Sequence, residues 1–447
     1  MTVPGLGIGR EIQAAIYRAG LFGRRPVVPT TPDALAEAAR RRMTKQAWAY
    51  VAAGAGQQRT LAANTEAFGR HRLLPRMLVD VENRDLGVEL FGRRLRSPVL
   101  LAPIGVLEMV HPDAERAVAA AARATGTPMV ISTQGSMPME EIAGALVDTP
   151  RLYQLYWSRD DDVVGSFLAR AEAIGADAVV VTLDTHLLGW RTADLDLGYL
   201  PFARAEGIAQ YTSDPAFRSL AERRAGASGS SPVPRPRLRE LPAAARTLAS
   251  ITRHCPGRFV DNLRSPYPRA AVETFLDVFS RSDLAWADLA RLREMTSLPI
   301  ILKGIQDPRD ARLALDHGVD GIVVSNHGGR QVDNGVASLD ALPGVVAAVE
   351  GRVPVLFDSG IRSGADVAVA LALGADAVLL GRPYVYGLAV AGAAGVQAVL
   401  EHVLAELDLT LGLVGARRLV DLRSRLAEGD TGDPATEFGR SRDGERL

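Results

Sequence analysis

Short apolar runs alternate with stretches of helical periodicity along most of the chain, from about residue 97 onward. The runs are rich in valine, isoleucine and leucine and are bounded by turn residues, which is typical of strands buried on both faces. We expect strands at eight places, residues 97–103, 128–133, 151–157, 178–184, 299–304, 321–326, 354–360 and 377–383. Helical patterns separate them, and two of these, residues 114–126 and 365–374, end in glycine, as helices often do. This alternation predicts the α/β class and a parallel (β/α)8 barrel, or TIM barrel, whose active site lies at the carboxyl ends of the strands.

The segments outside this alternation define the expected organisation of the chain. Residues 1–96 have mostly helical patterns and are expected to pack on the barrel as a lead-in, while residues 97–427 form the barrel itself. The connection after the fourth strand, residues 185–298, is much longer than the others and contains the Ser/Gly/Pro-rich piece GASGSSPVPRPR. We expect that piece to be a mobile loop and the insertion to act as a lid, the alternative being a surface insertion with no catalytic role. Residues 428–447 are polar and are expected to be disordered.

Composition restricts the classes of partner and compartment. Of the 447 residues 47% are apolar and 23% charged, so the chain can bury a core. The formal net charge of −1 provides no field that would attract nucleic acid or an anionic membrane, and we expect neither as a partner. The most apolar stretch, residues 365–400, is interrupted by Asp376, Arg382 and Pro383, which leaves runs too short to span a bilayer. The single cysteine, Cys255, and the absence of a secretory pattern predict a cytoplasmic protein, and no His/Cys cluster has the spacing of a metal site.

The ends of the last two expected strands carry small residues followed by arginine. The sequences are DSGIRSG and LGRP, which place Gly360, Arg362, Gly381 and Arg382 at the mouth of the barrel. Loops in this position commonly bind phosphate, since glycine lets backbone N–H groups approach an anion and arginine adds paired donors. The alternative is that these are ordinary turn glycines.

Polar side chains at the ends of strands two to five suit a flat, polar heterocycle such as a flavin ring. Ser132, Gln154 and Thr182 can form hydrogen bonds with it. Only two residues of the chain are lysines, and one of them, Lys303, ends the apolar run PIILK. Its charge would stabilise an anionic reduced flavin. A Schiff-base lysine and a buried ion-pair partner remain the alternatives for this residue.

A third group of residues suits a substrate that carries a carboxylate. Arg191 and Arg330 can form a guanidinium clamp, with phenolic hydroxyls from Tyr50 and Tyr156 nearby. His327, in the stretch SNHGGRQ, can remove a proton because the pKa of histidine lies near neutrality. A histidine at a strand end is in isolation more often a turn residue, but its coincidence with a phosphate site and a ring lining favours a catalytic base.

The chain resembles the FMN-dependent 2-hydroxy-acid oxidase and dehydrogenase family. The stretch SNHGGRQVD at residues 325–333 is the signature of that family. Supporting motifs extend from residue 45 to about 420 and include AYVAAGAG, NTEAF, LLPRMLVDV, LAPIG, QLYW, TLDT, LKGI, FDSGIRSGADV and LLGRPYVYGLA. Within the family, DTHLLGWRTADL followed by YLPF, and the N-terminal IYRAGLFG and VPTTPDAL, are most similar to the lactate 2-monooxygenase branch.

The resemblance implies FMN as the cofactor and a role for each matching position. His327 would be the base, paired with Asp184, and Tyr156 would contact the substrate hydroxyl. Tyr50, Arg191 and Arg330 would bind the substrate carboxylate. The cofactor-binding residues would be Pro103, Ile104, Gly105, Ser132, Gln154, Thr182, Lys303, Ser325, Asp358, Ser359, Gly360, Arg362, Gly381 and Arg382.

The resemblance also implies an activity. We expect oxidation of an L-2-hydroxy acid, specifically L-lactate, with O2 as acceptor and decarboxylation to acetate and CO2. Gly105 stands where several oxidases have alanine, and extra room there would retain the keto acid beside peroxide. A simple oxidase that releases H2O2, a quinone-linked dehydrogenase and an inactive barrel scaffold are the alternatives, although a scaffold would be expected to lack the base or the clamp. Family members form homo-oligomers, so a tetramer or octamer is expected.

Overall fold

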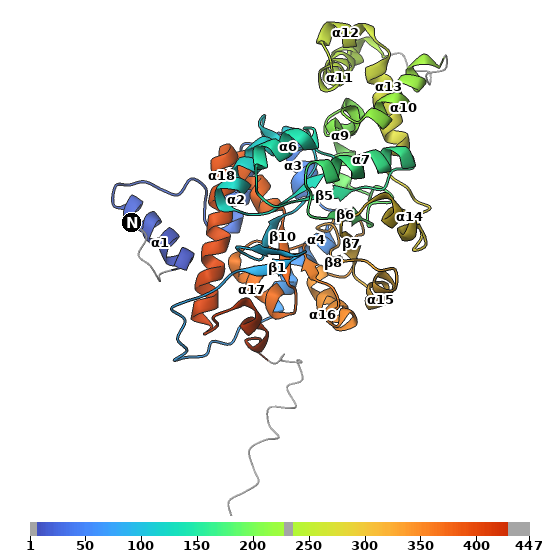
Figure 1. Cartoon of the computed structure of the whole chain (residues 1–447). Helices are drawn as coiled ribbons and strands as arrows, with labels where there is room; N and C mark the ends of the chain where they lie inside the picture. Colours follow the sequence, from blue (N-terminus) through green and yellow to red (C-terminus); the bar gives the residue numbers. More distant parts are fainter. Residues whose placement is uncertain (1–6, 228–235, 428–447) are drawn as a thin grey trace, which may run out of the picture.

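A computed structural model describes residues 7–227 and 236–427 of the chain. Its centre is a closed, parallel eight-stranded barrel in the order β10-β3-β4-β5-β6-β7-β8-β9 (Figure 1). This confirms the expected TIM barrel. The strands are β3 Val99–Leu101, β4 Met129–Ser132, β5 Arg151–Leu155, β6 Val179–Thr182, β7 Ile300–Ile305, β8 Gly321–Val324, β9 Val355–Phe357 and β10 Ala377–Leu380.

All eight strands lie at the expected places. Seven are shorter than their apolar runs, and β7 has the same length but begins one residue later. Nearly every strand residue is buried, because one face fills the barrel interior and the other packs against the surrounding helices. Ser132, Gln154, Thr182 and Lys303 lie in the carboxyl-terminal halves of their strands. The other polar residues lie in the loops that follow, and Arg382 already begins the helix α18 (Arg382–Leu413). These polar side chains are therefore at the carboxyl ends of the strands, where barrel enzymes carry their sites.

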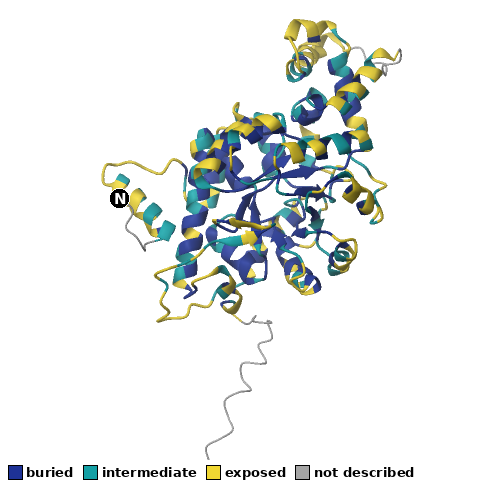
Figure 2. Cartoon of the chain, viewed as in Figure 1, coloured by how far each residue is buried: buried dark blue, intermediate teal, exposed yellow. Residues whose placement is uncertain are grey.

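Helices surround the barrel and complete its layers (Figure 2). Those that connect successive strands are α5 Ala114–Thr125, α6 Met139–Leu146, α7 Asp161–Ala173, α14 Asp288–Met295, α15 Pro308–Asp316, α16 Ser338–Val349 and α17 Gly364–Ala372. As expected from the sequence, α5 ends at a glycine, Gly126, in the left-handed conformation (φ 69°).

The helix α18 corrects one expectation about apolar length. By length and composition its 32 residues could cross a membrane, whereas the sequence analysis expected only apolar runs too short to span a bilayer. A kink at Ala391 and Gly392 divides it, and 56% of its most apolar window is buried inside the fold. It contacts α5 and α17, so it packs as a core helix of the barrel.

The first 96 residues contain the expected helices and also an unexpected hairpin. The helices are α1 Gly7–Gly20, α2 Pro32–Arg40, α3 Lys45–Ala52, α4 Arg59–Glu66 and the 3-10 turn η1 Ala67–Arg70. The hairpin pairs β1 (Val88–Leu90) with β2 (Arg93–Leu95). Its Leu90 and Leu95 belong to the same buried cluster as the side chains inside the barrel, so the hairpin closes the barrel interior.

The long insertion after β6 is mostly helical. It contains α8 Thr192–Asp196, η3 Pro201–Arg204, α9 Ala209–Thr212, α10 Pro215–Gly226, η4 Leu238–Glu240, α11 Leu241–His254, α12 Phe259–Arg264 and α13 Tyr267–Val278, followed by the barrel helix α14. The helices α11 and α12 project away from the barrel (Figure 1). Most of the piece expected to be a mobile loop, and the tail 428–447, lie outside the described residues.

Candidate active site

The loop after β8 bends sharply to place His327 over the end of the barrel. His327, Gly328 and Gly329 follow one another in the left-handed region, with φ values of 58°, 65° and 74°. A Cβ atom at Gly329 would lie 2.6 Å from the backbone nitrogen of Leu61, so only glycine permits this close approach to the N-terminal lead-in. Strain at His327 itself is held by the surrounding contacts, as is common at functional sites.

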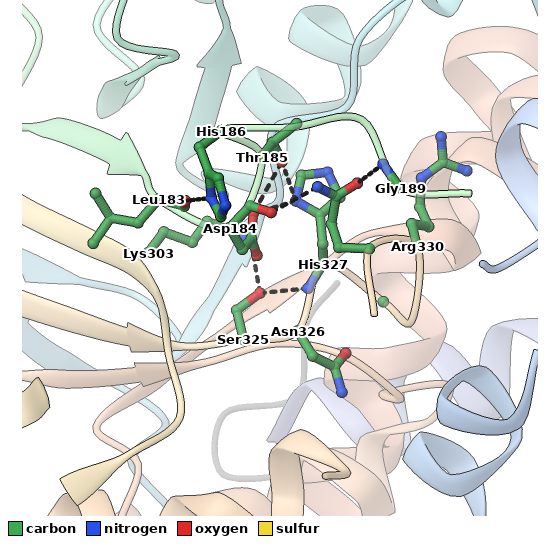
Figure 3. Close-up of polar contacts among 12 residues, drawn as sticks. Leu183, Asp184, Thr185, His186, Gly189, Lys303, Ser325, Asn326, His327 and Arg330 are labelled. Atoms are coloured by element: carbon green, nitrogen blue, oxygen red, sulfur yellow. Dashed lines mark hydrogen bonds and ion pairs between the residues drawn. The ribbon is translucent and has the colours of Figure 1, made fainter. Parts of the chain in front are cut away.

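His327 is paired with Asp184 from the loop after β6. Its Nδ1 lies 2.8 Å from Oδ1 of Asp184, and Thr185 donates to the same oxygen at 3.0 Å (Figure 3). The two side chains of the pair are only 19% and 13% exposed. Since an ionised Asp184 accepts a hydrogen bond from Nδ1–H, that bond assigns the tautomer in which Nε2 is free to act as a base.

The charge states of the pair favour proton removal. Burial lowers the pKa of His327, although Asp184 opposes that shift. Burial would raise the pKa of Asp184, but the charge and hydrogen bond of His327 and the charge of Lys303 hold that pKa below its ordinary value. At neutral pH the pair is therefore a neutral imidazole held by a carboxylate.

Two arginines and two tyrosines lie beside the base. The Arg330 guanidinium lies 4.8 Å from the centre of the Tyr50 ring and donates to the Tyr50 carbonyl oxygen. Burial, together with the charge of Arg191, lowers the pKa of Arg330 to about 10. No carboxylate of the described residues lies within 4 Å of either guanidinium, and only the more distant Asp194 offsets their charge, so this place suits an anion. Burial raises the pKa of Tyr50 and Tyr156, which keeps both hydroxyls protonated as donors.

A second pair of arginines lies at the ends of β9 and β10, where Arg382 is buried and Arg362 is half-buried. Burial lowers the pKa of Arg362, and burial with the neighbouring Arg362 lowers that of Arg382 to about 9. Within the described part of the chain neither forms an ion pair. Beside them, Gly360 has φ 108°, and a Cβ there would lie 2.2 Å from the Asn64 carbonyl oxygen. Two guanidiniums without an ion pair beside a glycine backbone suit a phosphate group.

Arg382 also supports the substrate side of the site. Its Nε donates to the carbonyl of Val51 at 2.9 Å, its Nη1 to Gly328 at 3.0 Å and its Nη2 to Ala53 at 3.2 Å. These carbonyls belong to the carboxyl end of α3 and to the His327 loop. Thr44 caps the other end of α3 by accepting from Ala47 N, and the helix thereby holds Tyr50 in place.

Between these two anion sites lie buried polar atoms that have no partner. Gln154 Nε2 and Thr182 Oγ1 are both buried and form no hydrogen bond with any described residue. Ser132 and the Thr133 backbone bind Gln154 through its oxygen, so its nitrogen is left to an absent group.

Lys303 lies in the same region as part of an ion pair. It binds Asp358 at 2.8 Å and Ser325 Oγ at 2.7 Å. Burial works against its charge, but Asp358 and Asp184 outweigh that effect and raise the pKa of Lys303. It is therefore a fixed cation, which argues against the Schiff-base alternative because that chemistry needs a neutral amine.

Most of the expected residues line one cavity of about 1080 Å³, counting the part open to solvent. They are Tyr50, Pro103, Ile104, Gly105, Gln154, Tyr156, Thr182, Arg191, Lys303, His327, Arg330, Asp358, Ser359, Gly360, Arg362, Gly381 and Arg382. Three expected residues support the lining from behind. Asp184 holds His327, Ser132 holds Gln154, and Ser325 binds Lys303 and the His327 backbone N–H.

Comparison with known proteins agrees with this geometry. The family model described as FMN-dependent dehydrogenase matches residues 39–428. An FMN-dependent alpha-hydroxy acid dehydrogenase of Penicillium citrinum is 38% identical over 92% of this chain and 93% of its own length. An L-lactate oxidase of Lysinibacillus sphaericus is 37% identical over 84% and 86% of the two chains. A mandelate oxidase structure with (S)-4-hydroxymandelic acid aligns with a TM-score of 0.72 at 34% identity, covering 89% of this chain and 98% of the other.

The chain belongs to the FMN-dependent dehydrogenase family. The family's cofactor is FMN, and the residues fit it. The Arg362 and Arg382 end provides the counter-charge for a phosphate, and the unpartnered Gln154 and Thr182 atoms provide hydrogen bonds for a polar ring. Among the described residues no group of His, Cys, Asp and Glu side chains has the geometry of a metal site.

Several residues that position this site were not predicted from the sequence. The amides of Asn64 and Asn326 bond each other reciprocally at 2.8 Å, and Asn326 also accepts from Gly329 N at 3.0 Å. Asp333 accepts from three backbone N–H groups at the start of α4, of which the Arg59 bond is 2.7 Å. Asn64 lies in the motif NTEAF, and Asn326 and Asp333 lie in SNHGGRQVD. Membership of these motifs was the sequence feature that could have identified the three residues. The insertion contributes three further lining residues. Leu188 and Phe202 lie in the stretches DTHLLGWRTADL and YLPF, whereas Phe279 lies in no motif named from the sequence.

Proposed function

We propose that this FMN-dependent 2-hydroxy-acid oxidoreductase oxidises L-lactate with O2 as acceptor, and that acetate, CO2 and water are the products. The observation that supports the reaction class is the His327–Asp184 pair beside two arginines that form no ion pair with any described residue, although Asp194 acts on both from a longer distance. A hydroxy acid supplies both missing components, a carboxylate for the clamp and a proton for the base.

The residues of the site have different roles in the oxidation. Arg191 and Arg330 bind the carboxylate and hold the 2-carbon in register with His327. The tyrosine hydroxyls donate hydrogen bonds, and His327 Nε2 accepts the proton that the acid loses. Asp184 then stabilises the imidazolium that forms. FMN, when bound, supplies the two-electron acceptor, which O2 reoxidises.

The size of the substrate is proposed from the cavity wall. Ile104, Leu188, Phe202 and Phe279 provide apolar surface in the same cavity as the clamp. The positive charges in that cavity are already engaged by the two proposed anion sites and by Asp358. A small, uncharged side chain such as the methyl group of lactate suits such a wall. The related L-lactate oxidase supports the same choice.

Retention and decarboxylation of the keto acid are supported by the similarity of residues 184–195 and 199–202 to the lactate 2-monooxygenase branch. Room at Gly105 does not add to that support. A Cβ at Gly105 would lie 2.8 Å from both Cβ and the carbonyl oxygen of Gln134, so the glycine serves the close contact between two loops. The relatives named as L-lactate oxidase and glycolate oxidase favour a second candidate, release of the keto acid and H2O2.

One experiment separates these possibilities. The purified holoenzyme is mixed with L-lactate without air, and its flavin absorbance is recorded; products are then measured in air. We expect bleaching without air, and acetate with CO2 in air. Pyruvate and H2O2 as the only products would establish the oxidase instead. A flavin that stays oxidised with lactate but bleaches with glycolate or (S)-mandelate would refute lactate as the substrate.

A further inference from the structure

Gln331 is a residue next to the clamp whose side-chain amide is fully engaged. Its Nε2 donates to the carbonyl oxygen of Asp184 at 2.6 Å and to that of Leu187 at 2.9 Å. Its Oε1 accepts from Arg191 Nη2 at 3.0 Å and from the Gly189 backbone N–H at 3.3 Å. A primary amide offers two donor hydrogens and two acceptor lone pairs, and here all four are used.

All four bonds reach one segment, the loop after β6, whereas Gln331 itself lies in the loop after β8. The two loops also meet through their backbones. Arg191 Nε donates to the Arg330 carbonyl at 3.3 Å, and a Cβ at Gly189 would lie 2.6 Å from that same oxygen. The amide therefore fixes the register of two loops in direct contact, one bearing His327 and Arg330 and the other bearing Asp184 and Arg191.

The partners of the amide are the parts of the site whose relative placement matters most. Asp184 orients the base, and Gln331 holds its backbone. Arg191 is one arm of the carboxylate clamp, and Gln331 holds its guanidinium. Gln331 does not line the cavity, so it reaches the substrate only through these residues.

No other side chain can replace this amide. Asparagine is one methylene shorter, glutamate keeps the acceptors but loses both donors, and methionine has the length but almost none of the hydrogen-bonding capacity. Losing the donors would leave two carbonyls without partners, and losing the acceptor would release Arg191.

We propose that Gln331 is a positioning residue that sets the distance between the carboxylate clamp and the base. The proposal rests on the proposed function of the site as a 2-hydroxy-acid oxidase, but not on which acid is oxidised. A displacement of either loop separates the carboxylate-binding group from the proton-accepting nitrogen. Rate depends steeply on that separation, because reacting groups must be held at near-contact distance.

The test uses the Q331M and Q331E holoenzymes. The matched control is Q397M, since Gln397 bonds only Glu401 along α18. Anaerobic stopped-flow mixing with the acid that bleaches wild type separates the dissociation constant from the rate of flavin reduction. For Q331M we expect the ratio of the flavin-reduction rate to the substrate dissociation constant to fall on the order of 100-fold. Its FMN content and melting temperature should stay near those of Q397M.

Q331E makes the expected effect specific. It keeps the acceptor oxygen that holds Arg191 and loses the donors that hold Asp184 and Leu187. Its carboxylate also becomes a counter-ion for Arg191, so we expect slowed reduction together with an oxalate affinity lower than that of Q331M. A loss of general stability would not order the oxalate affinities of the two variants in this way.

Two further measurements decide the outcome. Combining Q331M with Arg191→Met should be non-additive for affinity, because the first change acts through the second residue. Oxalate binding to the oxidised holoenzyme can be measured through the change in flavin absorbance. It compares the carboxylate affinities of the same variants without turnover. Wild-type kinetics in both variants, or full additivity with Arg191→Met, would overturn the positioning role. A wild-type enzyme that no 2-hydroxy acid reduces, yet whose oxalate affinity falls in Q331M, would overturn the proposed function and leave the positioning role standing.

Discussion

His327 is the residue whose replacement tests the base most directly. In His327→Gln the side chain keeps hydrogen-bonding capacity toward Asp184 but cannot accept the substrate's proton. We expect the variant to retain FMN, because the phosphate end and ring lining are untouched, and to lose roughly 100- to 10,000-fold in the rate of anaerobic flavin reduction. Reduction at a near-normal rate would remove the base assignment.

The same residue predicts a pH dependence. The base works only when neutral, and burial lowers the pKa of His327 from its ordinary value of 6.5. The kcat/KM for the hydroxy acid should therefore rise with pH through an inflection below 6.5 and be level at neutrality. An inflection above pH 7 would mean that substrate meets a protonated imidazole, contrary to the geometry. The measurement is a pH profile of kcat/KM in the wild type, with His327→Gln showing no inflection.

At the scale of single residues, the sequence predicted the side chains that line the cavity better than the side chains that position them. Arginine, histidine and lysine at strand ends are conspicuous, because a charge beside a buried run needs a partner. Gln331 and Asn64 are polar residues in a loop and a helix, elements in which most polar side chains are solvated, so their type alone indicates nothing. Their role depends on contacts between segments far apart in sequence, such as Asn64 with Asn326.

At the scale of elements, the insertion after β6 provides the wall of the cavity. Phe202 in η3 and Phe279 just after α13 both line it. Both contact the fully buried Phe275, Phe202 with a tilted ring at 5.3 Å and Phe279 with a stacked ring at 5.2 Å. Three aromatic rings packed in this way form a rigid boundary, since displacing one disturbs the others. We therefore expect the insertion to limit substrate size.

This wall predicts a change of specificity. Phe279→Ala should lower kcat/KM for L-lactate and raise it for a longer acid such as 2-hydroxyoctanoate, shifting their ratio by about 10- to 200-fold. Phe259→Ala, at an exposed position of α12 in the same insertion, is the control and should leave the ratio unchanged. If Phe279→Ala behaves like the control, the insertion does not bound the substrate.

The barrel elements were predictable because each strand is a continuous apolar run, and eight such runs admit few other folds. The β1–β2 hairpin was missed because its sequence, VEL and RRL, is short and charged, and only one residue of each strand is buried. Its position is decided by Leu90 and Leu95 entering the barrel interior, a tertiary contact with no local pattern.

At the scale of the whole molecule, an exposed apolar segment in the lead-in predicts self-association. In the motif LLPRMLVDV the side chains of Leu74, Met77 and Leu78 are 57%, 71% and 106% exposed. Neighbouring apolar side chains so open to water are typical of a contact surface. We expect light scattering at micromolar concentration to give the mass of a tetramer or octamer, as in the resembling family.

Variants of this segment test whether it forms the contact. Leu78→Asp suits the left-handed backbone at that position (φ 56°), where aspartate is tolerated better than leucine, so the fold should not suffer. Burying the new carboxylate in an interface is unfavourable, and we therefore expect the variant to dissociate into smaller species with its FMN still bound. Leu413→Asp, at a position 73% exposed near the end of α18, is the matched control and should keep the native mass. A wild-type monomer, or a Leu78→Asp protein of unchanged mass, would show that this segment is not an interface between copies of the chain.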